Sequence, residues 1–121
     1  MSDLADRLRL VQERIDQAAT SHGRKSEDIT LIVVSKFHPA KLVLDLVDLG
    51  VSNFGENRDQ EAKPKALEVA GILGEDHAPT WHFVGQLQSN KARSVLTYSR
   101  IIHSLDRPSL LKELAKIGEP A

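Results

Sequence analysis

The residues from 29 to 36, Ile-Thr-Leu-Ile-Val-Val-Ser-Lys, constrain the fold of this chain more than any other stretch. β-Branched and aliphatic residues follow one another almost without interruption, which is typical of a strand buried on both faces in a parallel sheet. The run ends at Lys36, which we therefore expect at the carboxyl edge of the sheet. Ligands bind at that edge in α/β folds. The sequence thus predicts a buried strand that leads into a candidate site.

Helical and strand-like segments alternate along the rest of the chain. One helix followed by four β-α units implies a parallel sheet with right-handed crossovers. We also expect a break at Pro64, because an interior proline removes a helical hydrogen bond. The expected helices cover residues 2–23, 38–50, 57–72, 88–96 and 106–117, and the expected strands cover residues 29–36, 51–54, 81–85 and 100–104.

The number of β-α units limits the fold class. Four units are half of an eight-unit barrel, which needs about 250 residues, whereas this chain has 121 residues. We therefore expect one α/β domain over residues 1–121, either a small open sheet or an incomplete barrel. A half barrel leaves two unpaired strand edges, through which copies of the chain could associate.

The composition excludes several classes of function. The chain carries 16 basic and 17 acidic residues, so it has no positive excess for binding nucleic acid. It has no cysteine, which rules out disulfides and thiolate metal sites. No apolar run approaches the length of a membrane span, and the N-terminus lacks an apolar signal core. We expect a cytoplasmic protein that binds a small molecule.

Each expected strand ends in polar residues, and parallel strands would bring these ends to one edge. Lys36 follows the buried run directly. Partial desolvation there would lower the pKa of its amine and favour reaction of the neutral form with an aldehyde. The alternative is a lysine that only points to solvent.

Other strand-end residues have two interpretations each. Asn57 is either a ligand contact or a helix N-cap, and Gly55 either lets backbone approach a ligand or makes a plain turn. Glu56 could act as an acid or base, although pairing with a nearby cation is favoured. His103 is a candidate site residue, whereas His82 is more typical of a core histidine. The five histidines lack close spacing and predict no metal site.

Four motifs occur in order along the chain. They are Val-Val-Ser-Lys at 33–36, Phe-Gly-Glu-Asn at 54–57, Trp-His-Phe-Val-Gly at 81–85 with Leu-Gln-Ser-Asn-Lys at 87–91, and Ile-His-Ser-Leu-Asp at 102–106. Together they resemble the pyridoxal-phosphate homeostasis protein family, also called the YggS/PROSC family. The resemblance covers nearly the whole chain and implies a fold like the N-terminal domain of alanine racemase, which is a (β/α)₈ TIM barrel. Arg58-Asp59 depart from the Tyr-Val of many members.

The resemblance also implies a cofactor. Family members hold pyridoxal 5′-phosphate as an internal aldimine on the lysine that matches Lys36, with the asparagine that matches Asn57 beside it. Their role is vitamin B6 homeostasis, with no robust catalytic activity assigned. They are about twice as long, and their second half grips the phosphate. In this chain, only a helix N-terminus at Ser89-Asn90 could bind the phosphate in place of that second half. We therefore expect weak, reversible binding of the cofactor.

Two alternatives to this interpretation are open. A racemase-like enzyme would use Lys36 as its base but also needs a tyrosine, and the only tyrosine, Tyr98, is expected inside a helix. A ligand-free half barrel that associates with itself is the other alternative.

Overall fold

The computed structural model describes residues 3–103, which divide into two compact units between Leu31 and Ile32. The first unit contains helix α1 (Asp3–Ser21) and a short 3₁₀ turn, η1 (Ser26–Asp28). Two acidic residues in the first turn of α1 suit the positive end of the helix dipole. Gly23 has a φ of 69°, so it ends the helix in the left-handed conformation that the sequence predicted.

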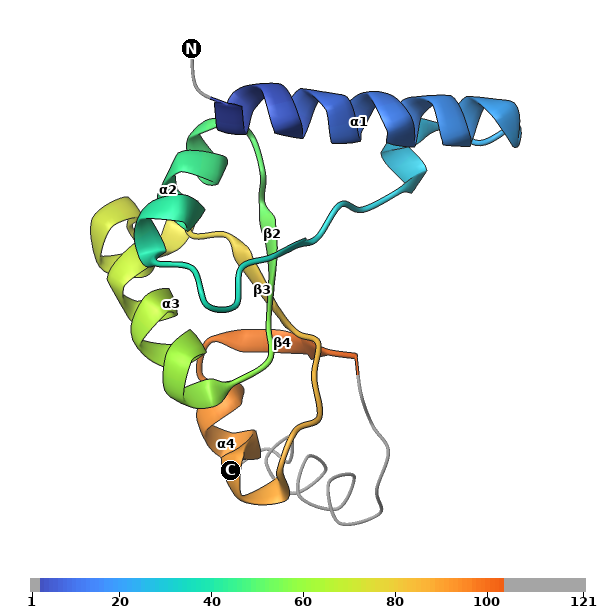
Figure 1. The fold of residues 1–121 in the computed structure, drawn as a ribbon. Coiled ribbons are helices and arrows are strands. Elements are labelled where there is room, and N and C mark those ends of the chain that lie inside the picture. The colour runs from blue at the N-terminus through green and yellow to red at the C-terminus, as the bar shows by residue number, and fades with distance from the viewer. Residues whose placement is uncertain (1–2, 104–121) are drawn as a thin grey trace. The chain divides into compact units, whose positions relative to one another are not determined.

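The second unit contains a sheet of four parallel strands in the order β1-β2-β3-β4 (Figure 1). This arrangement confirms the α/β fold class and the order of the β-α units expected from the sequence. The expected helix over residues 106–117 lies outside the described residues. The elements are β1 (Val33–Val34), α2 (Ala40–Asp48), β2 (Asn53–Glu56), α3 (Asp59–Leu73), η2 (Glu75–His77), β3 (Thr80–Phe83), η3 (Ser89–Lys91), α4 (Ala92–Val95) and β4 (Ser99–Ile102).

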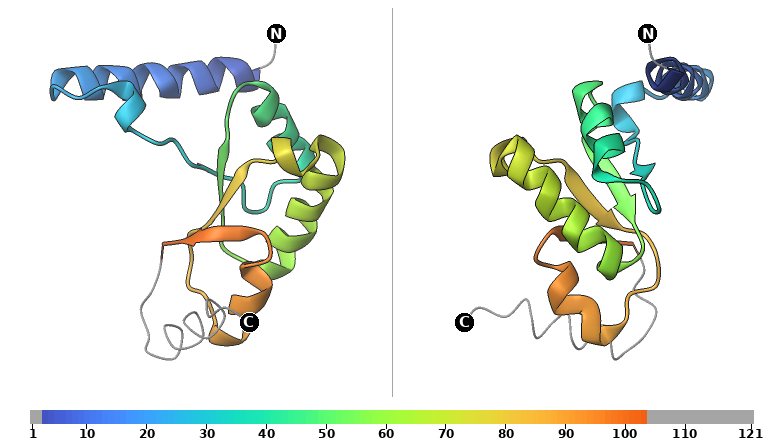
Figure 2. Two further views of the ribbon diagram at one scale, coloured as in Figure 1. Left: turned by 180° about the vertical axis from the view of Figure 1, so that it is seen from behind. Right: turned by 60° about the vertical axis from the view of Figure 1, so that its left-hand side comes forward.

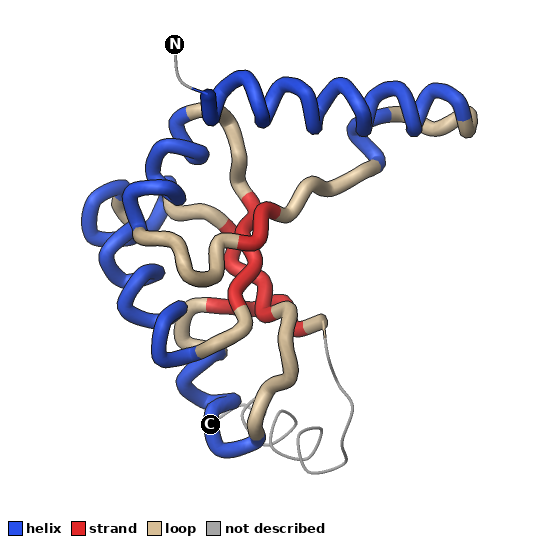
Figure 3. Tube along the Cα trace, viewed as in Figure 1, coloured by secondary structure: helices blue, strands red, loops and turns tan. Residues whose placement is uncertain are grey.

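Helices cover one face of this sheet. Helices α2, α3 and α4 all lie on the same side of the strands when the second unit is seen from the front and from behind (Figures 1 and 2). The core lies between these two layers, where the rings of Phe54 and Trp81 pack with centroids 5.7 Å apart. Phe83 and Leu87 pack against α4 in the same layer. The strands are short beside the helices and loops that surround them (Figure 3).

The strand predicted for residues 29–36 is much shorter in the structure. Only Val33 and Val34 form β1, and Val34 is 47% exposed, so the expectation of a strand buried on both faces is wrong. The reason is that Val34 lies on the face opposite the helices, which no helix of the second unit covers as far as residue 103, and β1 is an edge strand that pairs with β2 alone. Its position is nevertheless the expected one, because Lys36 follows it at the carboxyl edge.

The predicted break at Pro64 is also absent. Helix α3 runs without interruption past this proline. Because the helix begins at Asp59, the carbonyl that loses its partner is that of Gln60, in the first turn. Gln60 is exposed, so water can satisfy this carbonyl. The remaining strands are shifted by one or two residues from the expected ranges.

No helix within residues 3–103 is long and apolar enough to cross a membrane.

The fold predicts a large loss of stability when the aromatic core is truncated. Phe54 is fully buried, so Phe54→Ala should lower the free energy of unfolding by about 3–5 kcal/mol. The matched control is Leu67→Ala on the exposed side of α3, which should change it by less than about 0.5 kcal/mol. Urea unfolding followed by circular dichroism measures both. Equal losses in the two variants would contradict this assignment of the core.

Candidate functional site

The carboxyl edge of the sheet brings the candidate residues into one row. The Ser35 N–H donates to the Gly55 carbonyl at 3.0 Å, and the His103 N–H donates to the Phe83 carbonyl at 3.0 Å. These bonds continue the strand ladders to their last residues. Lys36, Asn57 and His103 therefore follow β1, β2 and β4 at the same edge, as the sequence predicted. None of the side-chain contacts described within residues 3–103 joins these three residues to one another.

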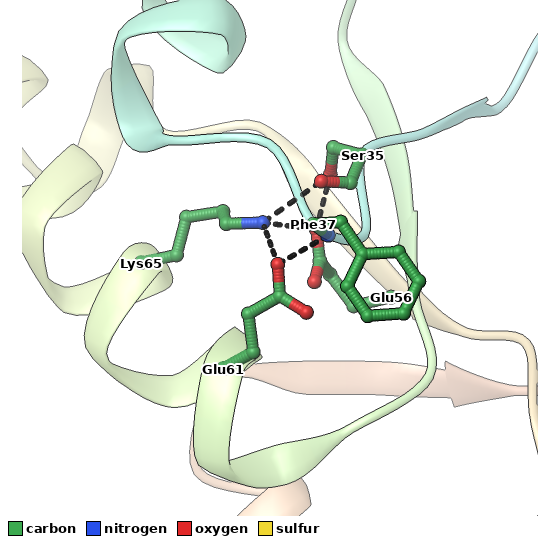
Figure 4. A network of polar contacts seen from close by, with 5 residues as sticks. All are labelled: Ser35, Phe37, Glu56, Glu61 and Lys65. Carbon is green, nitrogen blue, oxygen red and sulfur yellow. Dashed lines mark hydrogen bonds and ion pairs between the residues drawn. The ribbon is translucent and has the colours of Figure 1, made fainter.

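A buried ammonium group organises this edge. Lys65 of α3 is 6% exposed, and its Nζ lies 2.9 Å from Glu56 Oε2, 3.0 Å from Glu61 Oε2 and 2.9 Å from the Ser35 carbonyl oxygen (Figure 4). The Ser35 hydroxyl also donates to Glu56 Oε2. Glu56 is 1% exposed, so its charge is compensated inside the protein rather than by water. This confirms that Glu56 pairs with a cation.

The same network holds the backbone around Lys36. Lys65 bonds the carbonyl of Ser35, and Glu61 Oε2 accepts a hydrogen bond from the Phe37 N–H. Figure 4 shows the Lys65 and Glu61 side chains extending from α3 toward this loop. We call the four residues Ser35, Glu56, Glu61 and Lys65 the edge network.

Phe37 takes a backbone conformation that bulky residues rarely adopt. Its φ is 68°, and it is the only non-glycine residue with positive φ within the described part of the chain. Such a conformation costs on the order of 1–3 kcal/mol. Phe37 is 71% exposed, so burial of the aromatic surface does not offset this cost. Two hydrogen bonds hold the left-handed turn: the His38 N–H donates to the Ser35 carbonyl at 3.0 Å, and the Phe37 N–H donates to Glu61.

The pKa of the Glu61 carboxyl lies below its ordinary value. Burial raises this pKa, but the hydrogen bonds from Lys65 and from the Phe37 N–H outweigh that effect, with further help from the charges of Lys65 and Arg58. Glu61 therefore remains an ionised acceptor for the loop at neutral pH.

Lys36 itself is exposed in the turn after β1. Its Nζ lies 5.9 Å from the centroid of the Phe37 ring, at the outer limit of a cation–π contact. The partial desolvation expected from the sequence is therefore not seen. The physical reason is the edge position of β1, whose outer side has no neighbouring strand within the described residues.

Asn57 does not cap a helix. Helix α3 begins at Asp59, its N-cap residue is Arg58, and no side chain makes a capping bond there. The Oδ1 atom of Asn57 is buried and has no hydrogen-bond partner among the described residues. A Cβ atom at Gly85 would lie 2.7 Å from the Asn57 Cβ, so only glycine permits this close approach. The interpretation as an N-cap is wrong, and Asn57 offers an unused acceptor.

A cleft of about 320 Å³ lies beside Asn57. It is formed by the loops after β2 and β3, and the buried side chains of Phe83 and Leu87 line it together with the cations of Arg58 and Lys91. The carboxylate of Asp59 also lines the cleft, so its lining combines one unused acceptor, two cations and one anion and suits a polar ligand.

The two predicted histidines form a pair. His82 Nδ1 lies 3.0 Å from His103 Nε2, and His82 Nε2 lies 2.9 Å from Asn53 Oδ1. His82 is 5% exposed and hydrogen-bonded at both ring nitrogens, which confirms it as a core histidine. A one-residue shift in register lets Ile101, rather than Arg100, pair with His82. His103 therefore lies on the same face of the sheet as His82.

Tyr98 does not belong to the row of strand-end residues, although its hydroxyl reaches Asp59, which lines the cleft beside Asn57. It is in the turn between α4 and β4 rather than inside a helix, and its hydroxyl donates to Asp59 Oδ1 at 2.9 Å. Burial, followed by the hydrogen bond and charge of Asp59, raises the pKa of this phenol. It follows α4 at the amino end of β4, whereas the candidate residues lie at the carboxyl ends of the strands.

Sequence reasoning missed Lys65 and Glu61 as site residues. A signal was present, because Lys65 falls within the stripe of α3 that also contains buried Ala62, Ala66 and Val69. A lysine on a buried helical stripe requires an acidic partner. Glu61, four residues earlier, was the local candidate.

The histidine pair predicts a pH dependence of stability. Burial, and secondly the charge on His103, lowers the pKa of His82 below 6.5. As the pH falls below 6.5, His82 therefore becomes protonated in the unfolded chain before it does in the folded chain. The free energy of unfolding should be highest above this pH and decline below it, toward the folded pKa. His82→Gln should flatten this slope in urea titrations, while the exposed control His77→Gln should keep it.

Comparison with known proteins agrees with the sequence motifs. A pyridoxal phosphate homeostasis protein of Escherichia coli K12 is 41% identical over 109 residues, which cover 88% of this chain and 45% of that protein. The structure of PipY from Synechococcus elongatus PCC7942 with PLP bound is 38% identical, with a TM-score of 0.69, over 85% of this chain and 47% of PipY.

A crystal structure of an unknown protein from Bifidobacterium adolescentis is 27% identical with a TM-score of 0.80, over 96% of this chain and 51% of that one. No family model matches the chain. The chain spans about half the length of the curated relatives it matches. The resemblance found in the sequence is thereby confirmed, and the chain is a homologue of the pyridoxal phosphate homeostasis proteins.

Proposed function

We propose that this chain binds pyridoxal 5′-phosphate through a covalent bond to Lys36 and serves vitamin B6 homeostasis in the cytoplasm without catalysing a reaction. The observation that carries the proposal is the 38% identity to PipY, whose structure has PLP bound. The curated relatives are named homeostasis proteins, which supports a role in handling the cofactor. The proposed site consists of Lys36, Asn57 and His103.

The residues at the carboxyl edge fit one end of this cofactor. When bound, the cofactor supplies an aldehyde carbon that condenses with an amine and releases water. The exposed amine of Lys36 is free to approach such a carbon. The buried Oδ1 of Asn57 lacks a donor among the described residues and can accept a hydrogen bond from a ligand hydroxyl. His103 is exposed at the same edge, with its ring oriented by His82.

Binding of the phosphate group of the cofactor has less support from the residues of this chain. Arg58 and Lys91 line the cleft beside Asn57 and are the cations best placed there to attract a phosphate. Helix α4 with its preceding turn is too short to make a strong anion site at Ser89 and Asn90. Charge-assisted bonds to phosphate supply much of the affinity for such ligands. We therefore propose that these 121 residues bind the cofactor weakly and reversibly.

The racemase-like alternative has less support from the structure. It would require a tyrosine able to exchange a proton near Lys36. The Tyr98 hydroxyl donates a hydrogen bond to Asp59, and its raised pKa keeps the phenol protonated at neutral pH. We therefore favour a carrier or regulator over an enzyme.

The test of the site is reductive trapping. Pyridoxal 5′-phosphate and borohydride should label Lys36, and the label should be located by peptide mass mapping. Lys36→Ala should abolish most of this labelling while leaving the circular dichroism spectrum unchanged. The matched control is Lys41→Ala, which removes an exposed lysine paired only with Asp45 on α2. If Lys91 or another lysine carries the label in the unaltered chain, the assignment of Lys36 is wrong.

We further propose that the chain associates with itself through the edges of its sheet. Strands β1 and β4 are the two edges, and Val34 and Ile101 are exposed on the face opposite the helices. Within residues 3–103 neither edge has a further strand beside it, and such edges next to an apolar surface favour pairing with another chain.

Sedimentation equilibrium should therefore give a mass that rises with concentration. Val34→Lys should shift the chain toward the monomer, because a charge on an edge strand opposes pairing. Leu67→Lys on the exposed side of α3 is the control and should leave the mass unchanged. A monomer at every concentration would rule out this association.

A further inference from the structure

We propose that Glu61 and Lys65 are positioning residues that fix the direction in which the Lys36 side chain leaves the backbone. This inference rests on the proposed function, because it assigns how the chain prepares Lys36 for a carbonyl ligand. Neither residue contacts that ligand in the proposal. They act through the backbone on either side of Lys36.

The two residues hold both peptide groups of Lys36. Lys65 Nζ lies 2.9 Å from the carbonyl oxygen of Ser35, which belongs to the peptide group before Lys36. Glu61 Oε2 accepts from the N–H of Phe37, which belongs to the peptide group after Lys36. A side chain whose two flanking peptide groups are fixed can turn only about its own side-chain bonds.

The side chains of Glu61 and Lys65 thus form a clamp on the backbone of Lys36, and this clamp is itself rigid. Glu61 and Lys65 are one helical turn apart on α3, and their charged groups are 3.0 Å apart. Glu56 at the end of β2 bonds the same ammonium at 2.9 Å, which ties the clamp to the sheet. Figure 4 shows Lys65 and Glu61 meeting at the loop that follows β1. Helix, sheet and loop are thus joined at one nitrogen atom.

The conformation of Phe37 shows what the clamp acts on. A left-handed aromatic residue persists only where its surroundings determine its backbone. The exposed residue supplies no packing of this kind, so two hydrogen bonds do: the His38 N–H donates to the Ser35 carbonyl at 3.0 Å and closes the turn, and the Phe37 N–H donates to Glu61. Without the Glu61 acceptor, the turn keeps only its backbone bond, and we expect the loop to loosen and Lys36 to leave its present direction more often.

Glu61 is the better residue to change. Replacing Lys65 would leave the buried carboxylate of Glu56 unpaired, which endangers the fold. Glu61→Ala removes the acceptor for Phe37 while Lys65 remains paired with Glu56. Glu61→Gln keeps an acceptor oxygen without the charge. Glu68→Ala changes an exposed glutamate on the same helix and is the matched control.

Two measurements on the full chain test the inference. The first is the ratio of label on Lys36 to label on Lys41 after treatment with pyridoxal 5′-phosphate and borohydride. Glu61→Ala should lower this ratio about tenfold, since small misplacements of a reacting group have effects of this size or larger. The second is amide hydrogen exchange at Phe37, which should accelerate in Glu61→Ala. Glu61→Gln should largely retain both values, and Glu68→Ala should match the unaltered chain.

The outcomes separate this inference from the proposed function. Faster exchange at Phe37 with an unchanged labelling ratio would mean that Glu61 is merely structural, and it would overturn the positioning role. An unchanged exchange rate at Phe37 in Glu61→Ala would show that Glu61 does not hold this peptide group, and it would also overturn the positioning role. If the unaltered chain is not labelled at Lys36, the proposed function fails and the positioning role fails with it.

Discussion

The buried ammonium group of Lys65 is the interaction on which the carboxyl edge of the sheet depends. A charge removed from water must be surrounded by acceptors, and this one has two carboxylates and a backbone carbonyl. Each acceptor comes from a different segment, namely the end of β2, the first turns of α3 and the loop after β1. Satisfying one cation therefore fixes three pieces of the chain at the point where the candidate lysine begins.

The two faces of the sheet have different chemistry. The face toward the helices is apolar and closed. Phe54, Trp81 and Phe83 are buried there, Phe83 packs against α4, and the edge network lies at the carboxyl end of this face. The opposite face carries the pair of His82 and His103. Within the described residues of the second unit, no helix covers this opposite face. Val34 is exposed there. The arrangement matches one half of a barrel, with an outside covered by helices and an inside that carries the histidine pair beside exposed aliphatic side chains.

The proposed function relies on the part of the site that Lys36 and Asn57 form. An amine at Lys36 and an unused acceptor at Asn57 are suited to the carbonyl and hydroxyl end of pyridoxal 5′-phosphate. The cleft beside Asn57 has two cations, Arg58 and Lys91, and it also has the carboxylate of Asp59, which disfavours an anionic group. In the proposed function, binding depends more on covalent attachment than on capture of phosphate, so the direction in which the Lys36 side chain leaves the backbone is the quantity that the proposal makes most important.

The sequence by itself determined the order of the elements, the parallel sheet, the helix end at Gly23 and the row of strand-end residues. These follow from periodicity and from local backbone preferences, which need no knowledge of distant neighbours. Only the tertiary structure decided that β1 is a short edge strand, that α3 continues through Pro64 and that Asn57 faces a cleft instead of capping a helix. It also decided that Lys65 holds the loop of Lys36 from 30 residues away. Contacts at such separations depend on how elements pack, and local sequence patterns do not record packing.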